Sequence, residues 1–282
     1  MSVKSIALIS KPYCPQSWGI LHEIAARARR KGMVAYAPQE ANFKTVMHLG
    51  DEAIRAADAV IAVGGDGTLL GAARSLFNWH VPLLGVNLGT LGFLTDVAAS
   101  DIDSMLDALL AGAYQLEERI VLETWQKGLS RTSLAFNDAV IKSADGGQLA
   151  QYDVFVDGEA VFSLRADGLI VATPTGSTAY ALSANGPILH PALAAVGLVP
   201  LNPHSLTARP ITLPSACNIE VVSRGRVTSR LYCDGQPCGD LPDGESVLIR
   251  QAPLTVKMLH LNDYNIFNTL RKKLNWSSPR ER

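Results

Sequence analysis

The sequence has no marked excess of charge of either sign. Its 282 residues include 25 Lys and Arg against 26 Asp and Glu, which gives a formal net charge of −1 with His neutral. No basic run exceeds the short patch formed by Arg27, Arg29, Arg30 and Lys31. A surface for nucleic acid or for an anionic membrane normally needs a larger concentration of positive charge. We therefore predict that neither is a partner of this chain.

Long apolar runs and paired cysteines are also lacking. No segment approaches the ~18 consecutive apolar residues of a membrane span. The apolar stretch at 3–9 is too short for a signal peptide and is predicted to be a first strand. The four cysteines show no zinc-ligand pairing, and the six histidines show no His-Glu-x-x-His spacing. These absences predict a soluble, cytoplasmic protein with reduced thiols, and they single out no metal-ligand residue.

Two common phosphate-binding motifs are missing as well. There is no G-x-x-x-x-G-K-S/T sequence, and Leu70 stands where a G-x-G-x-x-G motif would have its third glycine. What is present is an apolar run, Ala59–Val63, followed at once by glycines, an acid and a hydroxyl. A strand, a tight glycine loop and a helix N-terminus together form a cradle for phosphate oxygens. The predicted phosphate loop consists of Gly64, Gly65, Gly67 and Thr68.

Asp66 is the informative residue of this loop. A carboxylate in a loop that only held phosphate would repel its ligand. Asp66 therefore suggests a further task, either accepting a proton from a hydroxyl or holding a metal ion that neutralises the phosphates. The alternative is an ordinary strand-to-helix turn in which the Asp only caps the helix.

The pattern of apolar residues divides the chain into two parts. Up to about residue 115, apolar runs alternate with helical stripes, as at 18–31 and 101–111. This alternation predicts a parallel sheet with helices on both faces. From Glu118 to about His260, short apolar runs such as Leu134–Ile141 are separated by Gly, Asp, Asn and Pro. That pattern is typical of a β-sandwich.

A second group of binding residues lies in the later part. The strand Leu169–Ala172 is followed by a turn rich in hydroxyl groups, and Tyr180 adds an aromatic face on which a base could stack. Asn137-Asp138 could hydrogen-bond a ribose diol. Each has an ordinary alternative, a Ser/Thr/Gly turn in the first case and an Asx turn at a strand end in the second.

Taken together, these segments resemble the NAD kinase family, and the resemblance covers nearly the whole chain. The glycine-acid loop is shared with diacylglycerol-type lipid kinases and, less closely, with phosphofructokinases, whereas Pro174–Tyr180 singles out NAD kinases. The resemblance rests on Gly64–Thr68, Asn87–Leu94, Asn137-Asp138, Asp167-Gly168 through Pro174–Tyr180 to Gly186-Pro187, and Asp263-Tyr264 to Trp276.

The resemblance implies an α/β plus all-β fold and a phosphotransferase reaction. Residues 1–115 would form a Rossmann-like domain that carries the loop, 116–262 a β-sandwich NAD-binding domain, and 263–282 a C-terminal helix that packs back on the N-terminal domain. The enzyme would use ATP, or inorganic polyphosphate in some members, to phosphorylate the 2′-hydroxyl of the adenosine ribose of NAD. The product would be NADP, a divalent cation such as Mg²⁺ would take part, and the chain would form a homodimer or homotetramer.

The resemblance also implies roles for single residues. Asp66 would be the catalytic base, and Arg165 and Asp167 would reach the dinucleotide at an oligomer contact. Asn185 stands where the family commonly has glycine, but Asn tolerates left-handed geometry. Gln148 stands at a position that is basic or His in some relatives. The NAD-binding residues would be Asp66, Gly67, Phe93, Asn137, Asp138, Arg165, Asp167, Thr178, Ala179, Tyr180, Ala181, Leu182, Ser183 and Gln236.

Two other functions are compatible with parts of this pattern. A lipid kinase of the diacylglycerol type would share only the loop around Asp66, and it would need a hydrophobic or basic docking surface that the sequence does not show. A non-catalytic NAD(P)-binding sensor would keep the fold, but loss of the acid would favour it, and Asp66 is present.

Overall fold

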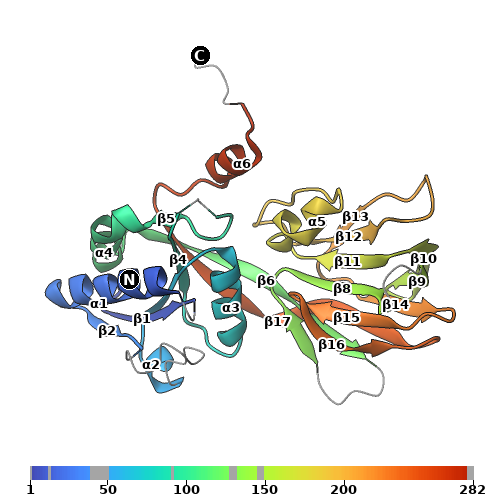
Figure 1. Cartoon of the computed structure of the whole chain (residues 1–282), viewed down its shortest axis with the longest axis horizontal. Helices are drawn as coiled ribbons and strands as arrows, with labels where there is room; N and C mark the ends of the chain where they lie inside the picture. Colours follow the sequence, from blue (N-terminus) through green and yellow to red (C-terminus); the bar gives the residue numbers. More distant parts are fainter. Residues whose placement is uncertain are drawn as a thin grey trace. The chain divides into compact units, whose positions relative to one another are not determined.

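The computed structural model describes residues 2–11, 14–38, 51–89, 92–126, 132–144 and 149–277. The chain forms two compact units, the first made of Met1–Glu118 and Val256–Arg282 and the second of Arg119–Thr255 (Figure 1). The predicted boundary after residue 262 differs from this division. The reason is that the last part of the final strand pairs within the first unit, where Met258 lies opposite Leu83.

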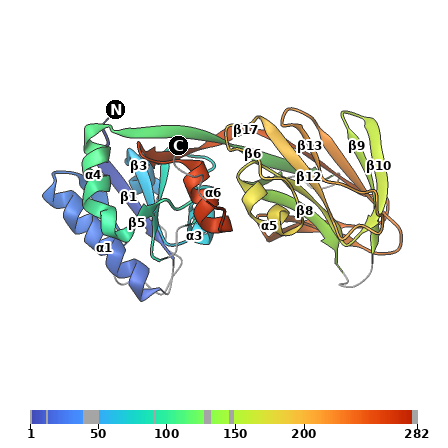
Figure 2. The same cartoon turned by 90° about the horizontal axis from the view of Figure 1, so that it is seen from above.

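The first unit contains a parallel sheet in the order β2-β1-β3-β4, with β5 also paired to β4. Every residue of β3 and β4 is buried, because helices cover both faces of these strands. In Figures 1 and 2, α1 and α4 lie on one side of the sheet and α3 on the other. The elements are β1 (Ser5–Ser10), α1 (Pro15–Arg30), β2 (Val34–Tyr36), α2 (Asp51–Arg55), β3 (Ala59–Val63), α3 (Asp66–Ser75), β4 (Leu83–Asn87), β5 (Val97–Ala98), α4 (Ile102–Ala111) and α6 (Ile266–Leu274).

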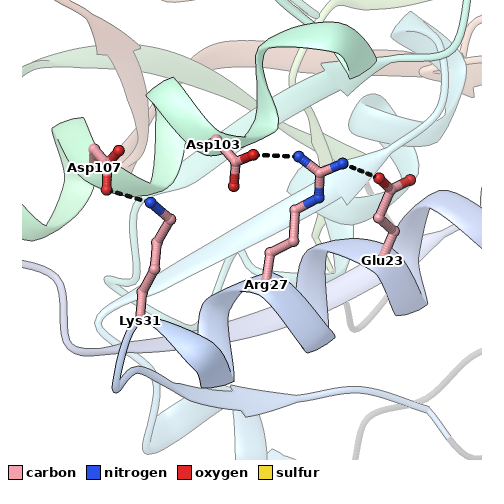
Figure 3. Close-up of polar contacts among 5 residues, drawn as sticks. All are labelled: Glu23, Arg27, Lys31, Asp103 and Asp107. Atoms are coloured by element: carbon pink, nitrogen blue, oxygen red, sulfur yellow. Dashed lines mark hydrogen bonds and ion pairs between the residues drawn. The ribbon is translucent and has the colours of Figure 1, made fainter.

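The basic patch of the sequence takes part in helix packing. Arg27 of α1 forms ion pairs with Glu23 of the same helix and with Asp103 of α4, and Lys31 pairs with Asp107 (Figure 3). These side chains are partly exposed, so each pair contributes little to stability, about 0–1 kcal/mol. They do show that acids of α4 neutralise part of the patch.

The second unit is a sandwich of two antiparallel sheets. One has the order β10-β9-β14-β17 with β6 and β7 at its side, and the other has the order β13-β12-β11-β8-β15-β16. Between them lies a core that includes Tyr152, Val171 and Val247. The strands are β6 (Tyr114–Gln126), β7 (Ser133–Ala135), β8 (Asp138–Ser143), β9 (Ala150–Val156), β10 (Glu159–Ala166), β11 (Gly168–Ala172), β12 (Ala195–Leu201), β13 (Ile211–Pro214), β14 (Ile219–Arg224), β15 (Ser229–Cys233), β16 (Gln236–Leu241) and β17 (Ser246–Leu261), and the short helix is α5 (Tyr180–Ser183).

The predicted fold class, an α/β part and an all-β sandwich, is confirmed. One strand differs from its prediction, because the run Leu134–Ile141 is broken into β7 and β8 at Phe136 and Asn137. None of the helices within the described ranges is long and apolar enough to cross a membrane.

Candidate active site

The glycine loop of the first unit lies where β3 ends and α3 begins. Gly65 is the N-cap of α3, and its carbonyl accepts hydrogen bonds from the backbone N–H groups of Thr68 (2.9 Å) and Leu69 (3.1 Å). A Cβ atom on Gly64 would lie 2.3 Å from Thr68 Oγ1, so the loop closes this tightly only around glycine. Helix α3 therefore starts with open backbone N–H groups, as a phosphate site requires.

Asp66 is the first residue of α3 and does not act as its cap. Its carboxylate accepts hydrogen bonds from the second glycine loop instead. The N–H of Phe93 donates to Oδ2 (2.8 Å), while the N–H of Leu94 (3.0 Å) and the hydroxyl of Thr95 (3.3 Å) donate to Oδ1. Hydrogen bonds to a carboxylate are about twice as strong as neutral ones, so they fix its orientation. Oδ1 already accepts two of these bonds, so Oδ2 is the oxygen that keeps a lone pair for a further donor.

The two glycine loops can meet because of a glycine in the second one. A Cβ atom on Gly92 would lie 2.0 Å from Asp66 Oδ1. Asn87 supports the same loop, because its Nδ2 donates to Thr95 Oγ1 (3.2 Å) and its Oδ1 accepts from the N–H of Gly89 (2.6 Å). Thr90 and Leu91 lie outside the described residues. The structure thus brings together the predicted residues Asp66, Gly67 and Phe93, and it adds Thr95, which sequence reasoning missed.

In the second unit, Asp234 organises the predicted Asn137-Asp138 turn. Its carboxylate accepts hydrogen bonds from the N–H groups of Phe136 (2.9 Å), Asn137 (2.7 Å) and Asp138 (3.2 Å). These N–H groups turn toward a side chain, which is why the predicted strand is interrupted here. Sequence reasoning missed Asp234. The available signal was its position in an Asp234-Gly235 turn with positive φ at both residues, between β15 and β16.

The turn that follows β11 packs directly on Asn137. Thr173 Oγ1 donates to the carbonyl of Phe136 (2.7 Å) and accepts from the N–H of Gly176 (3.1 Å). A Cβ atom on Gly176 would lie 2.0 Å from the carbonyl oxygen of Asn137. In this setting Asn137 Oδ1 is buried and has no hydrogen-bond partner. Because buried polar atoms are normally paired, this oxygen is a candidate to accept a hydrogen bond from a ligand.

Tyr180 begins the short helix α5 at the end of this turn and is 46% exposed, so its ring is accessible for stacking. The predicted residues Thr178, Ala179, Ala181, Leu182 and Ser183 belong to the same segment. Asn185 follows with a φ of 59°, so the expectation that Asn adopts left-handed geometry at this position is confirmed.

The remaining predicted residues lie near opposite ends of β11. Gln236 starts β16 next to the Asp234 turn, at the end of the sheet where Asn137 lies. Arg165 and Asp167 lie beside the other end of β11. At that end Gly168 is opposite Lys142, whereas at the Asn137 end Ala172 is opposite Asp138. The length of that strand, about 15 Å, separates them from the Asn137 turn in one copy of the chain. Gln148 lies outside the described residues.

Asp138 gives this turn a pH dependence. Burial, and then the negative charge of Asp234, raise the pKa of Asp138 to about 7. Between about pH 4 and pH 7 the unfolded chain has lost this proton while the folded chain keeps it, so this group makes the free energy of unfolding decrease as pH rises. The free energy of unfolding of the parent should therefore fall between about pH 5 and pH 8. We expect Asp138→Asn to make this fall smaller by about 2–3 kcal/mol, measured by urea denaturation at each pH.

Asp153→Asn is the matched control for this measurement. The Arg224 side chain lowers the pKa of Asp153, so that carboxyl stays ionised in both states over the same pH range. An unchanged pH dependence in Asp138→Asn would show that Asp138 is not the titrating group.

Comparisons with known proteins give the family. The family model described as "ATP-NAD kinase N-terminal domain" matches residues 19–114, and the one described as "ATP-NAD kinase C-terminal domain" matches 136–261. The NAD kinase of Azoarcus sp. (strain BH72) is 43% identical over 287 aligned residues, which cover 98% of this chain and 97% of that protein. The NAD kinase of Thiobacillus denitrificans is 46% identical over 222 residues, covering 78% and 77%.

Solved structures support the fold. A crystal structure of yeast NADH kinase complexed with NADH matches with a TM-score of 0.87 and 23% identity over 99% of this chain and 89% of that one. An NAD kinase from Archaeoglobus fulgidus in complex with ATP matches with a TM-score of 0.77 and 24% identity over 95% and 99%. With the family models and the relatives, these likenesses lead to one conclusion: the chain belongs to the NAD kinase family.

Proposed function

We propose that this chain transfers the terminal phosphoryl group of ATP, or of polyphosphate, to the 2′-hydroxyl of the adenosine ribose of NAD and so produces NADP. The observation that carries this proposal is the carboxylate of Asp66. It lies at the first residue of α3, within a glycine loop, and three donors of a second glycine loop fix its direction.

Asp66 is proposed as the general base. A ribose hydroxyl is a poor nucleophile near neutral pH, and a positioned carboxylate that accepts its proton accelerates the reaction by about 10²–10⁴-fold. The proton would pass from the 2′-hydroxyl to a carboxylate oxygen as the ribose oxygen attacks the terminal phosphorus atom. The bond from that phosphorus to its bridging oxygen would break, releasing ADP or the shortened polyphosphate. Most of the remaining acceleration in phosphoryl transfer comes from positioning and charge neutralisation. Here the backbone N–H groups at Gly65 and Gly67 would supply part of it.

A divalent cation fits this site only together with the substrate. Among the residues that the structure describes, no group of three or more His, Cys, Asp or Glu side chains could hold a metal ion. Mg²⁺ commonly binds one or two carboxylates, several waters and the phosphates of a substrate. Asp66 would therefore be the protein's carboxylate near such an ion, and the ion would neutralise charge on the transferred phosphoryl group.

The second unit is proposed to bind the dinucleotide. Asn137 offers its buried amide oxygen, Asp138 a carboxyl beside it, and Tyr180 an exposed ring for stacking. The segment Thr178–Ser183 and Gln236 would complete this binding surface. Arg165 and Asp167 lie at the other end of β11, so we propose that they contact NAD bound to another copy in a homodimer or homotetramer. The expected location is the cytoplasm, where ATP and NAD are available.

The direct test is to incubate the purified protein with ATP, Mg²⁺ and NAD and to follow NADP with a dehydrogenase specific for it. We expect NADP to appear only when a phosphoryl donor and the cation are present. Polyphosphate replaces ATP in a parallel reaction, which identifies the donor. Binding of NAD by calorimetry without any NADP from either donor would refute the proposal in favour of a sensor.

A further inference from the structure

A buried histidine lies next to the loop that holds Asp66. His260, near the end of β17, is 2% exposed, and its ring stacks on Tyr264 with centroids 3.8 Å apart. Its Nδ1 lies 2.7 Å from Asp96 Oδ2, and its Nε2 lies 3.4 Å from Glu117 Oε2. The distance from Nδ1 to Asp96 is that of a hydrogen bond, and an N–H group at Nδ1 would donate it to the carboxylate.

Asp96 connects this histidine to the proposed base. It directly follows Thr95, and residues 93–95 supply all three donors that Asp66 accepts from this loop. The N–H of Gly92 donates to the carbonyl of Thr95 (3.2 Å), so the loop is closed on itself just before Asp96. Asn87 anchors the hydroxyl of Thr95, while the Asp96–His260 contact ties the C-terminal end of the loop to β17.

We infer that His260, acting through Asp96, is a positioning residue that holds the loop 92–95 against Asp66. This inference rests on the role proposed for Asp66 and extends it to a part of the chain 164 residues away from Asp96. The physical reason is that a general base must be held in a narrow range of directions, and a loop fixed at only one end does not hold it. A displacement of about 1 Å in such a support reduces turnover strongly.

Two replacements of the histidine test its N–H donor and its stacking ring separately. His260→Phe keeps an aromatic ring for stacking on Tyr264 but has no N–H group. His260→Asn places an amide N–H near the position of Nδ1 and so keeps a donor toward Asp96. We expect His260→Phe to lower kcat by about tenfold and to change the KM values for NAD and ATP less than about threefold. His260→Asn should recover most of the lost kcat. Asp96→Ala, which removes the acceptor, should behave like His260→Phe.

Asp263→Ala is the control variant. Asp263 and Asp96 line the same pocket of about 220 Å³ beside α6, but no contact joins Asp263 to His260 among those the structure gives. We expect its kcat to stay within twofold of the parent value. A loss of kcat in this variant equal to that in Asp96→Ala would assign the effect to the charge of the pocket and overturn the inference.

Double variants test whether His260 acts through this route. The loss in His260→Phe/Asp96→Ala should be no larger than in either single variant, and His260→Phe should cause no further loss in an Asp66→Asn background. Amide hydrogen exchange at 92–95 should be faster in His260→Phe than in the parent. Additive losses of kcat in the double variants, or an unchanged kcat in a folded His260→Phe protein, would overturn the inference. If His260→Phe does not fold, Asp96→Ala gives the same decision.

The parent enzyme and Asp66→Asn separate this inference from the function it rests on. A parent protein that makes no NADP, or an Asp66→Asn variant with normal turnover, would refute the proposed function. A parent that is active, an Asp66→Asn variant that is not, and a His260→Phe variant with normal kcat would refute only the role of His260.

Discussion

We expect replacement of Asp66 by Asn to lower kcat by about 100-fold or more and to leave the affinity for NAD within several-fold of the parent value. The amide has nearly the shape of the carboxylate but cannot accept the proton of a ribose hydroxyl. It also turns its NH₂ group toward a donor, because Phe93 donates to one carboxylate oxygen and Leu94 and Thr95 to the other. Steady-state kinetics with NAD and ATP, together with calorimetric binding of NAD, measure both quantities.

Asp58→Asn is the control for this experiment. Asp58 precedes β3, whereas Asp66 follows it. The carboxylate of Asp58 also accepts hydrogen bonds from two backbone N–H groups, those of Lys4 and Ser5 (2.8 Å each). Loss of hydrogen bonds to a carboxylate should reduce stability in both variants, by about 1–3 kcal/mol. Only Asp66→Asn should lose turnover. An Asp66→Asn enzyme with near-normal kcat would eliminate Asp66 as the base.

We expect replacement of Gly176 by Ala to weaken NAD binding by about 100-fold. The new Cβ would lie 2.0 Å from the carbonyl oxygen of Asn137 and 2.4 Å from its carbon, and backbone atoms cannot move away by changing a rotamer. The turn after β11 must therefore separate from the Asn137 turn, which displaces the proposed contacts for the dinucleotide. Displacements of about 1 Å have effects of this size. Overpacking of this kind also destabilises a protein by about 1–3 kcal/mol.

Gly197→Ala is the matched control in the neighbouring strand β12. The nearest atoms to its new Cβ are side-chain carbons of Val199 at 3.8 Å and Leu189 at 3.9 Å, which is ordinary contact. We expect the affinity of this variant for NAD, measured by calorimetry, to stay within about twofold of the parent value. Tight binding of NAD by Gly176→Ala would show that contact between the two turns is not needed for the dinucleotide site.

Local patterns in the sequence carried the prediction of the fold class. The alternation of apolar runs with helical stripes indicated the parallel sheet, and short apolar runs between turns indicated the sandwich. Helix α1 buries Leu21, Ile24, Ala25 and Ala28, which share one face at helical spacing. The break between β7 and β8 did not follow from the pattern, because the run Leu134–Ile141 is apolar enough for one strand. Only the carboxylate of Asp234 explains it.

Residues that are neighbours in the chain were enough to predict the two-part architecture and to single out the glycine loop with Asp66 as a candidate phosphate site. Which distant groups fix these features depends on the tertiary fold. Asp66 is held by Phe93, 27 residues away, Asn137 by Asp234, 97 residues away, and Asp96 by His260, 164 residues away. Such pairs depend on strand order and register, which bring separate loops to the same end of a sheet. Periodicity along the chain contains no record of that juxtaposition.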